Sequence, residues 1–201
     1  MGMLEIKRET RSNFSFLAIL LFAIPYLTSI YMFMGTIQDR IQFIEQERRG
    51  LVYYQTLTDL RRKVQKERSE AYLLASPQAL VSARKAVHGA IEQIDAKEAL
   101  VVALNVTQEW SELKQHILGL NTHTKGNQSR QETLKKYTAV LAQIDAFSRV
   151  VVDNSNLVLD PQLDSYYLMD ISTRSIPLLD EMISRAHIAI WHRKRSWKRQ
   201  G

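Results

Sequence analysis

The sequence contains no cysteine, and only seven glycines and four prolines occur among its 201 residues. Without cysteine the chain can form no disulfide framework, no zinc–thiolate site and no thiol nucleophile. The scarcity of glycine and proline favours long helices over a turn-rich β fold. No segment alternates apolar and polar residues as a half-buried strand does. The expected fold class is therefore all-α.

The residue patterns that carry catalysis are missing as well. No serine lies in a Gly-x-Ser-x-Gly setting, and neither a glycine-rich phosphate loop nor an Asp-rich calcium loop occurs. The five histidines are not grouped at metal-ligand spacing. Glu112 and His116 are four residues apart, but this spacing is common on solvated helix faces. We predict no enzymatic activity, no cofactor and no metal site.

The net charge of +6 comes largely from the end of the chain. Five basic residues lie among the last nine, namely Arg193, Lys194, Arg195, Lys198 and Arg199. The basic character therefore describes a tail and not a domain surface. We expect residues 187–201 to lie outside the folded domain. They are either the product of a truncation or frame shift, or a segment that touches anionic lipid.

Further basic residues lie between residues 48 and 63, in a segment that is predicted below to be helical. We interpret them as solvated charges: Arg48, Arg49, Arg61, Arg62 and Lys63. The sequence has neither a helix-turn-helix pattern nor an aromatic stacking platform beside them. We therefore predict no nucleic-acid partner.

A long uncharged segment near the N-terminus predicts a membrane helix. No charged residue occurs in residues 14–35, and a helix needs about 20 apolar residues to cross the hydrocarbon core. A cleaved signal peptide or a buried core helix are the alternatives, but the small-x-small cleavage site of a signal peptide is not found. The lipid bilayer is thus an expected partner. Basic residues flank the segment almost evenly, so their count does not fix its orientation.

Apolar residues then recur at helical spacing along most of the chain. A first helix is predicted as far as Ala75, after which Ser76 and Pro77 fit the N-cap and first position of the next. Two apolar stripes follow, over residues 80–94 and 100–120, and whether they form one continuous helix is left open. Residues 121–129 are the clearest loop in the chain.

The second half of the chain predicts two more helices. Ser129 and Glu132 fit a capping box that opens a helix reaching Leu159. Asp160 and Pro161 fit the start of a last helix, which Pro177 should kink or interrupt. Together these segments predict an antiparallel four-helix bundle over residues 36–186, continuous with the membrane helix.

One segment also resembles a known family. Residues 155–170 read Ser-Asn-Leu-Val-Leu-Asp-Pro-Gln-Leu-Asp-Ser-Tyr-Tyr-Leu-Met-Asp. This is similar to a segment in the helical periplasmic sensor regions of bacterial transmembrane receptors, which include methyl-accepting chemotaxis proteins, sensor histidine kinases and diguanylate cyclases. A looser similarity covers residues 47–60 and 64–69, where Thr56, Glu67 and Ser69 replace the Pro, His and Gly of the family pattern.

The resemblance implies a topology and a function. Residues 1–13 would lie in the cytoplasm, the helix 14–35 in the inner membrane, and residues 36–186 in the periplasm, to which the absence of cysteine is suited. The chain would be the ligand-sensing input region of a signal-transduction receptor without its output module, and its long helices would offer a surface for a homodimer. The alternative is a membrane-tethered helical bundle that binds a protein partner and no small molecule.

A pocket between bundle helices is the expected place for an unknown small ligand. The candidate ligand-binding residues are Arg68, Tyr72, Asp160, Asp164, Tyr166, Tyr167 and Asp170. Arg68 would bind an anionic group through its planar guanidinium, and the tyrosines would offer apolar faces with a polar end. Structural roles are the alternative: a cap for Asp160, core positions for the tyrosines, and an ion pair between Asp170 and Arg174.

Overall fold

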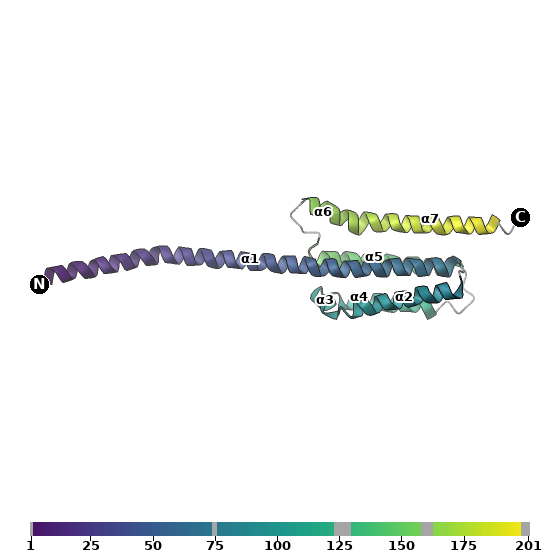
Figure 1. The fold of residues 1–201 in the computed structure, drawn as a ribbon, viewed down its shortest axis with the longest axis horizontal. Coiled ribbons are helices and arrows are strands. Elements are labelled where there is room, and N and C mark those ends of the chain that lie inside the picture. Colours follow the sequence, from purple (N-terminus) through teal and green to yellow (C-terminus); the bar gives the residue numbers. More distant parts are fainter. Residues whose placement is uncertain (1, 74–75, 123–129, 158–162, 198–201) are drawn as a thin grey trace. The chain divides into compact units, whose positions relative to one another are not determined.

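The structure is a computed structural model that describes residues 2–73, 76–122, 130–157 and 163–197, with side chains described for 20–73, 76–120, 130–157 and 167–191. The described residues are almost entirely helical and contain no strand, so the all-α prediction is confirmed. The elements, labelled in Figure 1, are α1 (Gly2–Leu73), α2 (Pro77–Asp95), α3 (Glu98–Ala103), α4 (Thr107–Thr122), α5 (Arg130–Asn154), α6 (Leu163–Asp170), the π-helix η2 (Ile171–Ser175) and α7 (Ile176–Trp197).

The chain divides into two compact units, Met1–Glu45 and Gln46–Gly201. In the first unit α1 exposes large apolar side chains from Leu20 to Met34. By length and composition, one helix of the described residues is apolar enough to cross a membrane, and it lies near the N-terminus. This agrees with the predicted membrane helix, although the boundary between the units falls ten residues later than the predicted start of the domain at residue 36.

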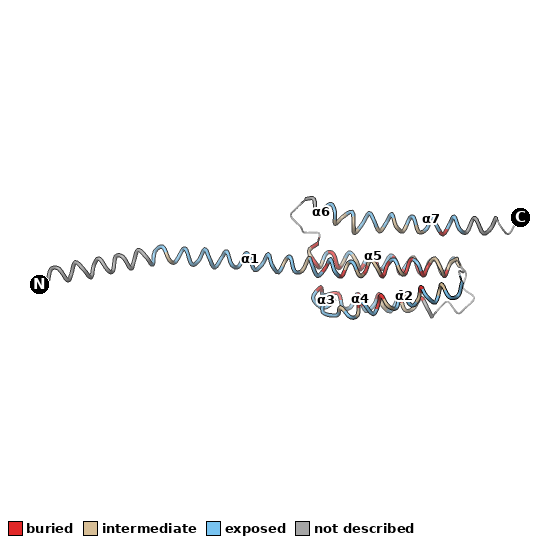
Figure 2. The backbone as a smooth tube through the Cα atoms, in the orientation of Figure 1, coloured by how far each residue is buried: buried red, intermediate tan, exposed pale blue. Residues whose placement is uncertain are grey.

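The hydrophobic core belongs to the second unit and is built by four helices. Its buried residues, red in Figure 2, come from α1, α2, α4 and α5 and from the α3 turn. The ring of Phe147 on α5 lies 6.2 Å, between centroids, from both Tyr53 on α1 and Trp110 on α4. Contacts between α1 and α5 join Gln46 to Asn154 and Glu67 to Tyr137, so the two helices run in opposite directions. Removal of these apolar side chains from water is the main stabilising contribution.

Residues 77–120 do not form one continuous helix, so the apolar stripes at 80–94 and 100–120 belong to separate helices. The helical segment stops at Asn105, whose φ of 53° lies in the left-handed region that asparagine tolerates. The amide of Val106 donates to the carbonyl of Val101, and the amide of Asn105 to that of Val102. This is a Schellman motif, and α4 then turns back along α2, where Trp110 Nε1 donates to Asp95 Oδ1 at 2.9 Å.

A second Schellman motif ends α5 at Asn154, so the prediction of a helix reaching Leu159 is wrong. Asn156 has a φ of 60°, and the amide of Leu157 donates to the carbonyl of Val152. Val152 and Leu157 are both buried, which is the apolar contact that accompanies this motif.

Two of the predicted helix boundaries are confirmed. The side chain of Ser76 accepts from the amide of Ala79 at 3.2 Å, and Pro77 opens α2. Proline at 177 removes an amide donor and crowds the carbonyl four residues earlier, and the π-helix η2 interrupts the regular helix directly before it. Asp160, Pro161 and the Ser129 cap lie outside the described residues.

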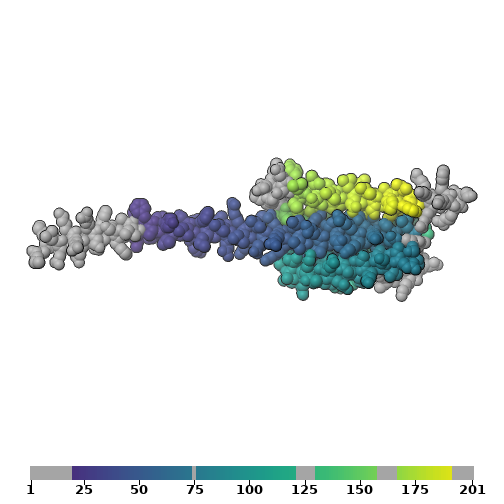
Figure 3. Space-filling model, viewed as in Figure 1, coloured from purple at the N-terminus to yellow at the C-terminus, as the bar shows by residue number. Residues whose placement is uncertain are grey.

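Helix α7 lies outside the core. It runs in the same direction as α1, because Tyr54 contacts Ser172, Arg61 contacts Asp180 and Arg68 contacts Ser184. Figure 3 shows its yellow-green surface along α1. Among its described side chains Ile188 alone is buried. The helix continues through residue 187, where the tail was predicted to begin, to Trp197.

The outward side of α7 is apolar. Its exposed large apolar side chains are Ile176, Leu178, Leu179, Met182, Ile183, Ile190 and Trp191. An ordinary surface helix turns its apolar side toward the core. Helix α7 is oriented the other way, with its apolar side exposed.

Tyr53→Phe is expected to raise the free energy of unfolding by about 1 kcal/mol, because a buried hydroxyl without a hydrogen bond is destabilising. Tyr53 is fully buried, its hydroxyl has no partner in the described part of the chain, and burial raises its pKa. Urea denaturation measures the change. Tyr137→Phe is the matched control: it deletes a 2.8 Å bond to Glu67 and should lower stability. Equal losses in both variants would contradict the assignment.

Candidate functional site

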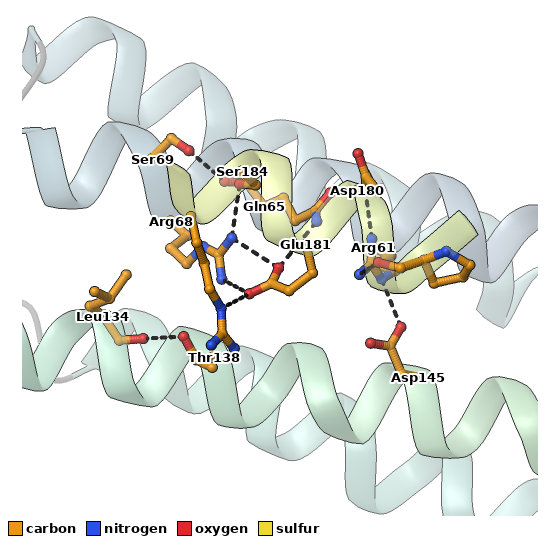
Figure 4. Close-up of polar contacts among 12 residues, drawn as sticks. Arg61, Gln65, Arg68, Ser69, Leu134, Thr138, Asp145, Asp180, Glu181 and Ser184 are labelled. Carbon is orange, nitrogen blue, oxygen red and sulfur yellow. Dashed lines mark hydrogen bonds and ion pairs between the residues drawn. The ribbon is translucent and has the colours of Figure 1, made fainter. Parts of the chain in front are cut away.

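Two arginines on one face of α1 form the most distinctive polar feature of the structure. Arg61 and Arg68 are separated by two helical turns, and both side chains are buried. The prediction that Arg61 is a solvated charge is therefore wrong. A buried charge is tolerated only with hydrogen-bonded partners, and for both arginines these come largely from α7 (Figure 4).

Arg68 is bound by the carboxylate of Glu181. Its Nη1 donates to Oε1 at 2.6 Å and its Nη2 to Oε2 at 3.0 Å, which is a bidentate pair. Nη2 also donates to Ser184 Oγ at 2.8 Å, while Gln65 and Arg185 donate to the same carboxylate. Burial raises the pKa of Glu181, but the hydrogen bonds from Arg68 and Arg185 outweigh it and the net pKa is lowered. Glu181 thus remains ionised near neutral pH.

Arg61 joins three helices. Its Nε donates to Asp145 Oδ1 on α5 at 2.7 Å, and its Nη1 donates to Asp180 Oδ2 on α7 at 2.7 Å. Its Nη2 donates to the carbonyl of Pro177 at 2.8 Å. One side chain of α1 therefore fixes both α5 and the beginning of α7.

A cavity of about 270 Å³ lies beside Arg61, lined by residues of α1, α5, η2 and α7. Tyr54 closes one side, where its hydroxyl donates to the carbonyl of Ser172 at 2.9 Å. Burial raises the pKa of Tyr54, so the phenol is neutral there. The cavity is close to the lower end of the size range of small-molecule sites, which begins at about 300 Å³.

A second buried polar cluster lies around Glu67, on the side of α1 that faces α2 and α5. Glu67 is 1% exposed, accepts from the Tyr137 hydroxyl at 2.8 Å, and lies 3.5 Å from Arg84 Nε. Burial raises the pKa of Glu67 despite these two contacts. Glu67 on α1 therefore links α2 and α5 through Arg84 and Tyr137.

Four of the predicted ligand-binding residues have described side chains, and these four do not lie in one site. Arg68 binds an anionic group as predicted for its chemistry, but the group is a carboxylate of the chain itself. Tyr72 is half-buried at the far end of α1, and Tyr167 is 55% exposed. Asp170 lies 3.6 Å from Arg174, as its structural alternative predicted. Asp160 and the side chains of Asp164 and Tyr166 lie outside what the structure describes, so a ligand contact by these residues stays a prediction.

The residues that sequence reasoning missed are the partners of Arg61. Asp145 and Asp180 are 84 and 119 positions away from it, and no local pattern connects them. One signal was present: Arg61 is four residues after Leu57 and Arg68 four after Val64, so both lie next to the apolar stripe of α1 and not opposite it.

Comparisons with protein-family models, curated proteins and solved structures give no significant match for this chain. In the described residues no group of three or more histidine and carboxylate side chains could hold a metal ion. What the site offers chemically is hydrogen bonding and charge, at a point where α7 is joined to α1.

Proposed function

We propose that this chain is the ligand-sensing, membrane-anchored input region of a bacterial signal-transduction receptor of the chemoreceptor, histidine kinase or cyclase type. In this proposal the apolar part of α1 crosses the inner membrane once, and α1, α2, α4 and α5 form an antiparallel four-helix sensor body in the periplasm. The resemblance of residues 155–170 to receptor sensor regions and the apolar segment near the N-terminus support it.

The observation that carries the proposal is the polar attachment of α7. A sensor needs one helix that can change position without unfolding the rest. Helix α7 contributes one buried apolar side chain among those described, and it is held by Arg61 and Arg68 through directional ion pairs. In a buried ion pair, the free energy lost by removing the two charges from water offsets much of their attraction. Separating α7 from α1 therefore costs less free energy than separating a core helix from the bundle.

The absence of cysteine allows a direct test with single cysteines in the full chain. Glu98→Cys, at an exposed position of α3, should react with a membrane-impermeant maleimide on intact cells. Ser12→Cys should react only after lysis. Labelling of both on intact cells, or of neither, or release of the protein by an alkaline wash, would overturn the membrane topology.

The mobility of α7 is tested in the same background. Ile188→Cys on α7 and Val140→Cys on α5 are buried to similar extents, at 4% and 5% exposure. We expect Ile188→Cys to be labelled at least about tenfold faster, because local opening of α7 needs less free energy than opening of the core. Equal rates would show that α7 opens only with the whole domain.

A second candidate function is a tethered interaction module without a small ligand. The exposed apolar side of α7 favours it, since contiguous exposed apolar surface marks interaction sites. In that case a partner protein would cover Leu179 and Ile183.

A further inference from the structure

We propose that the cavity beside Arg61 binds a small, neutral, polyhydroxylated compound, either a monosaccharide or a sugar alcohol. This inference deepens the sensor function and rests on it. The cavity of about 270 Å³ has room for a small molecule only, and it is lined by α1, α5, η2 and α7 together. Of the sequence-predicted ligand residues whose side chains the structure describes, Arg68, Tyr72, Tyr167 and Asp170, none lines it.

The charge of the cavity favours a neutral ligand. Among the described residues its lining contains four charged side chains, Arg61, Arg62, Asp145 and Asp180, and their charges cancel. Arg61 is already paired with both carboxylates at 2.7 Å. A ligand with a net charge would upset this balance, whereas a neutral ligand keeps it and leaves both ion pairs of Arg61 intact.

The hydrogen-bonding groups favour hydroxyls. A guanidinium only donates and an ionised carboxylate only accepts, whereas a hydroxyl donates one hydrogen bond and accepts two. Asp145 and Asp180 each bind Arg61 through one oxygen, which leaves the second oxygen as an acceptor. Adjacent hydroxyls of a polyol can donate to these oxygens and accept from Arg62 or from the Ser148 hydroxyl, all of which line the cavity.

The apolar part of the lining suits the carbon skeleton of such a compound. Tyr54, Ile176 and Pro177 lie in the same wall, and Tyr54 is held in place by its bond to the Ser172 carbonyl. Ser172 belongs to η2, and π-helical turns are frequent at functional sites. A ligand here would contact α1, α5 and the start of α7 at once, and would therefore favour the attached position of α7.

The test is thermal unfolding of the full chain in a detergent without sugar groups. The probes are D-ribose, D-galactose and D-mannitol at millimolar concentration, with L-serine, succinate and putrescine as the zwitterionic, anionic and cationic alternatives. We expect at least one polyol to raise the melting temperature by about 2 °C or more, and isothermal titration to give saturable binding. None of the charged probes should do so.

Two variants and a control decide whether the cavity is the site. Ser148→Leu fills the cavity without changing its charge, and Asp145→Asn replaces an acceptor by a donor; both should abolish the shift. Asp153→Asn, exposed on the same helix, should keep it. Since polyols also stabilise proteins by exclusion from the surface, an equal shift in Ser148→Leu would overturn the proposal. So would no shift with any polyol, or a shift with a charged probe alone.

This result is independent of the cysteine-labelling test. A chain that labels as a periplasmic membrane protein but binds no polyol loses only the ligand class. A chain that binds a polyol but washes off the membrane keeps the site and loses the receptor function.

Discussion

Gly50→Ala is expected to lower the free energy of unfolding by about 2–3 kcal/mol. A Cβ built at Gly50 would lie 2.0 Å from Ser155 Cβ and 2.1 Å from its Oγ, and Ser155 is fully buried. A serine Cβ cannot rotate away, so α1 and the end of α5 must separate. This loss exceeds the gain of about 1 kcal/mol that alanine normally brings to a helix interior. Urea denaturation of the full chain measures the difference.

Two companion variants isolate the cause. Ser155→Gly removes the clashing atoms, so the double variant Gly50→Ala, Ser155→Gly should recover most of the lost stability, with a favourable coupling in the double-mutant cycle. Gly89→Ala on α2, where an added Cβ meets nothing within 4 Å, should be neutral or stabilising. A destabilising Gly89→Ala of the same size would contradict this explanation, because alanine would then lower stability where its Cβ meets no other atom.

Arg68→Met is expected to lower the free energy of unfolding by about 3–5 kcal/mol, because it leaves the Glu181 carboxylate without its bidentate partner. The side chains of Arg68 and Glu181 are 0% and 13% exposed. The double variant Arg68→Met, Glu181→Leu removes both charges and should be close to the wild type in stability. If the double variant is no better than Arg68→Met alone, the pair is not the origin of the loss.

The pH dependence of the same pair has a definite sign. The pKa of Glu181 is lowered in the folded chain, so its contribution is fully present above the unfolded-state pKa of about 4.3 and is lost as the pH falls through the folded-state pKa. The difference in stability between the wild type and Arg68→Met should therefore be largest near neutral pH and shrink on acidification. Chemical denaturation at a series of pH values tests this directly.

The sequence correctly predicted the features that depend on residues close together in the chain. Ser76 and Pro77 begin α2 as expected, because an N-cap hydroxyl and a proline at the first position act within one turn. The irregularity before Pro177 was predicted for the same reason. The apolar stripes of α1, α2, α4 and α5 likewise identified most of the core.

The sequence predictions failed for helix ends that an asparagine determines and for burial that depends on residues from other helices. Asn105 and Asn156 both adopt left-handed conformations that end helices, yet each lies inside an apolar pattern that continues past it. The burial of Arg61 depends on Asp145 and Asp180 from other helices, and α7 presents its polar side to α1. Helical periodicity shows that a helix is amphipathic, but it does not show which side will be buried.

The π-helix η2 allows α7 a second, distinct rotational orientation about its own axis. A π-helical turn holds about one residue more than an α-helical turn, and one residue of an α-helix corresponds to a rotation of about 100°. If Ile171–Ser175 rewound as α-helix, α7 would rotate by roughly that angle about its own axis, and Asp180 would leave Arg61. The helix would thus have two angular settings instead of a continuous range. Deletion of Ser175 should fix it in the present one, because a π-turn that loses its extra residue becomes an α-turn with the same orientation of the helix on either side.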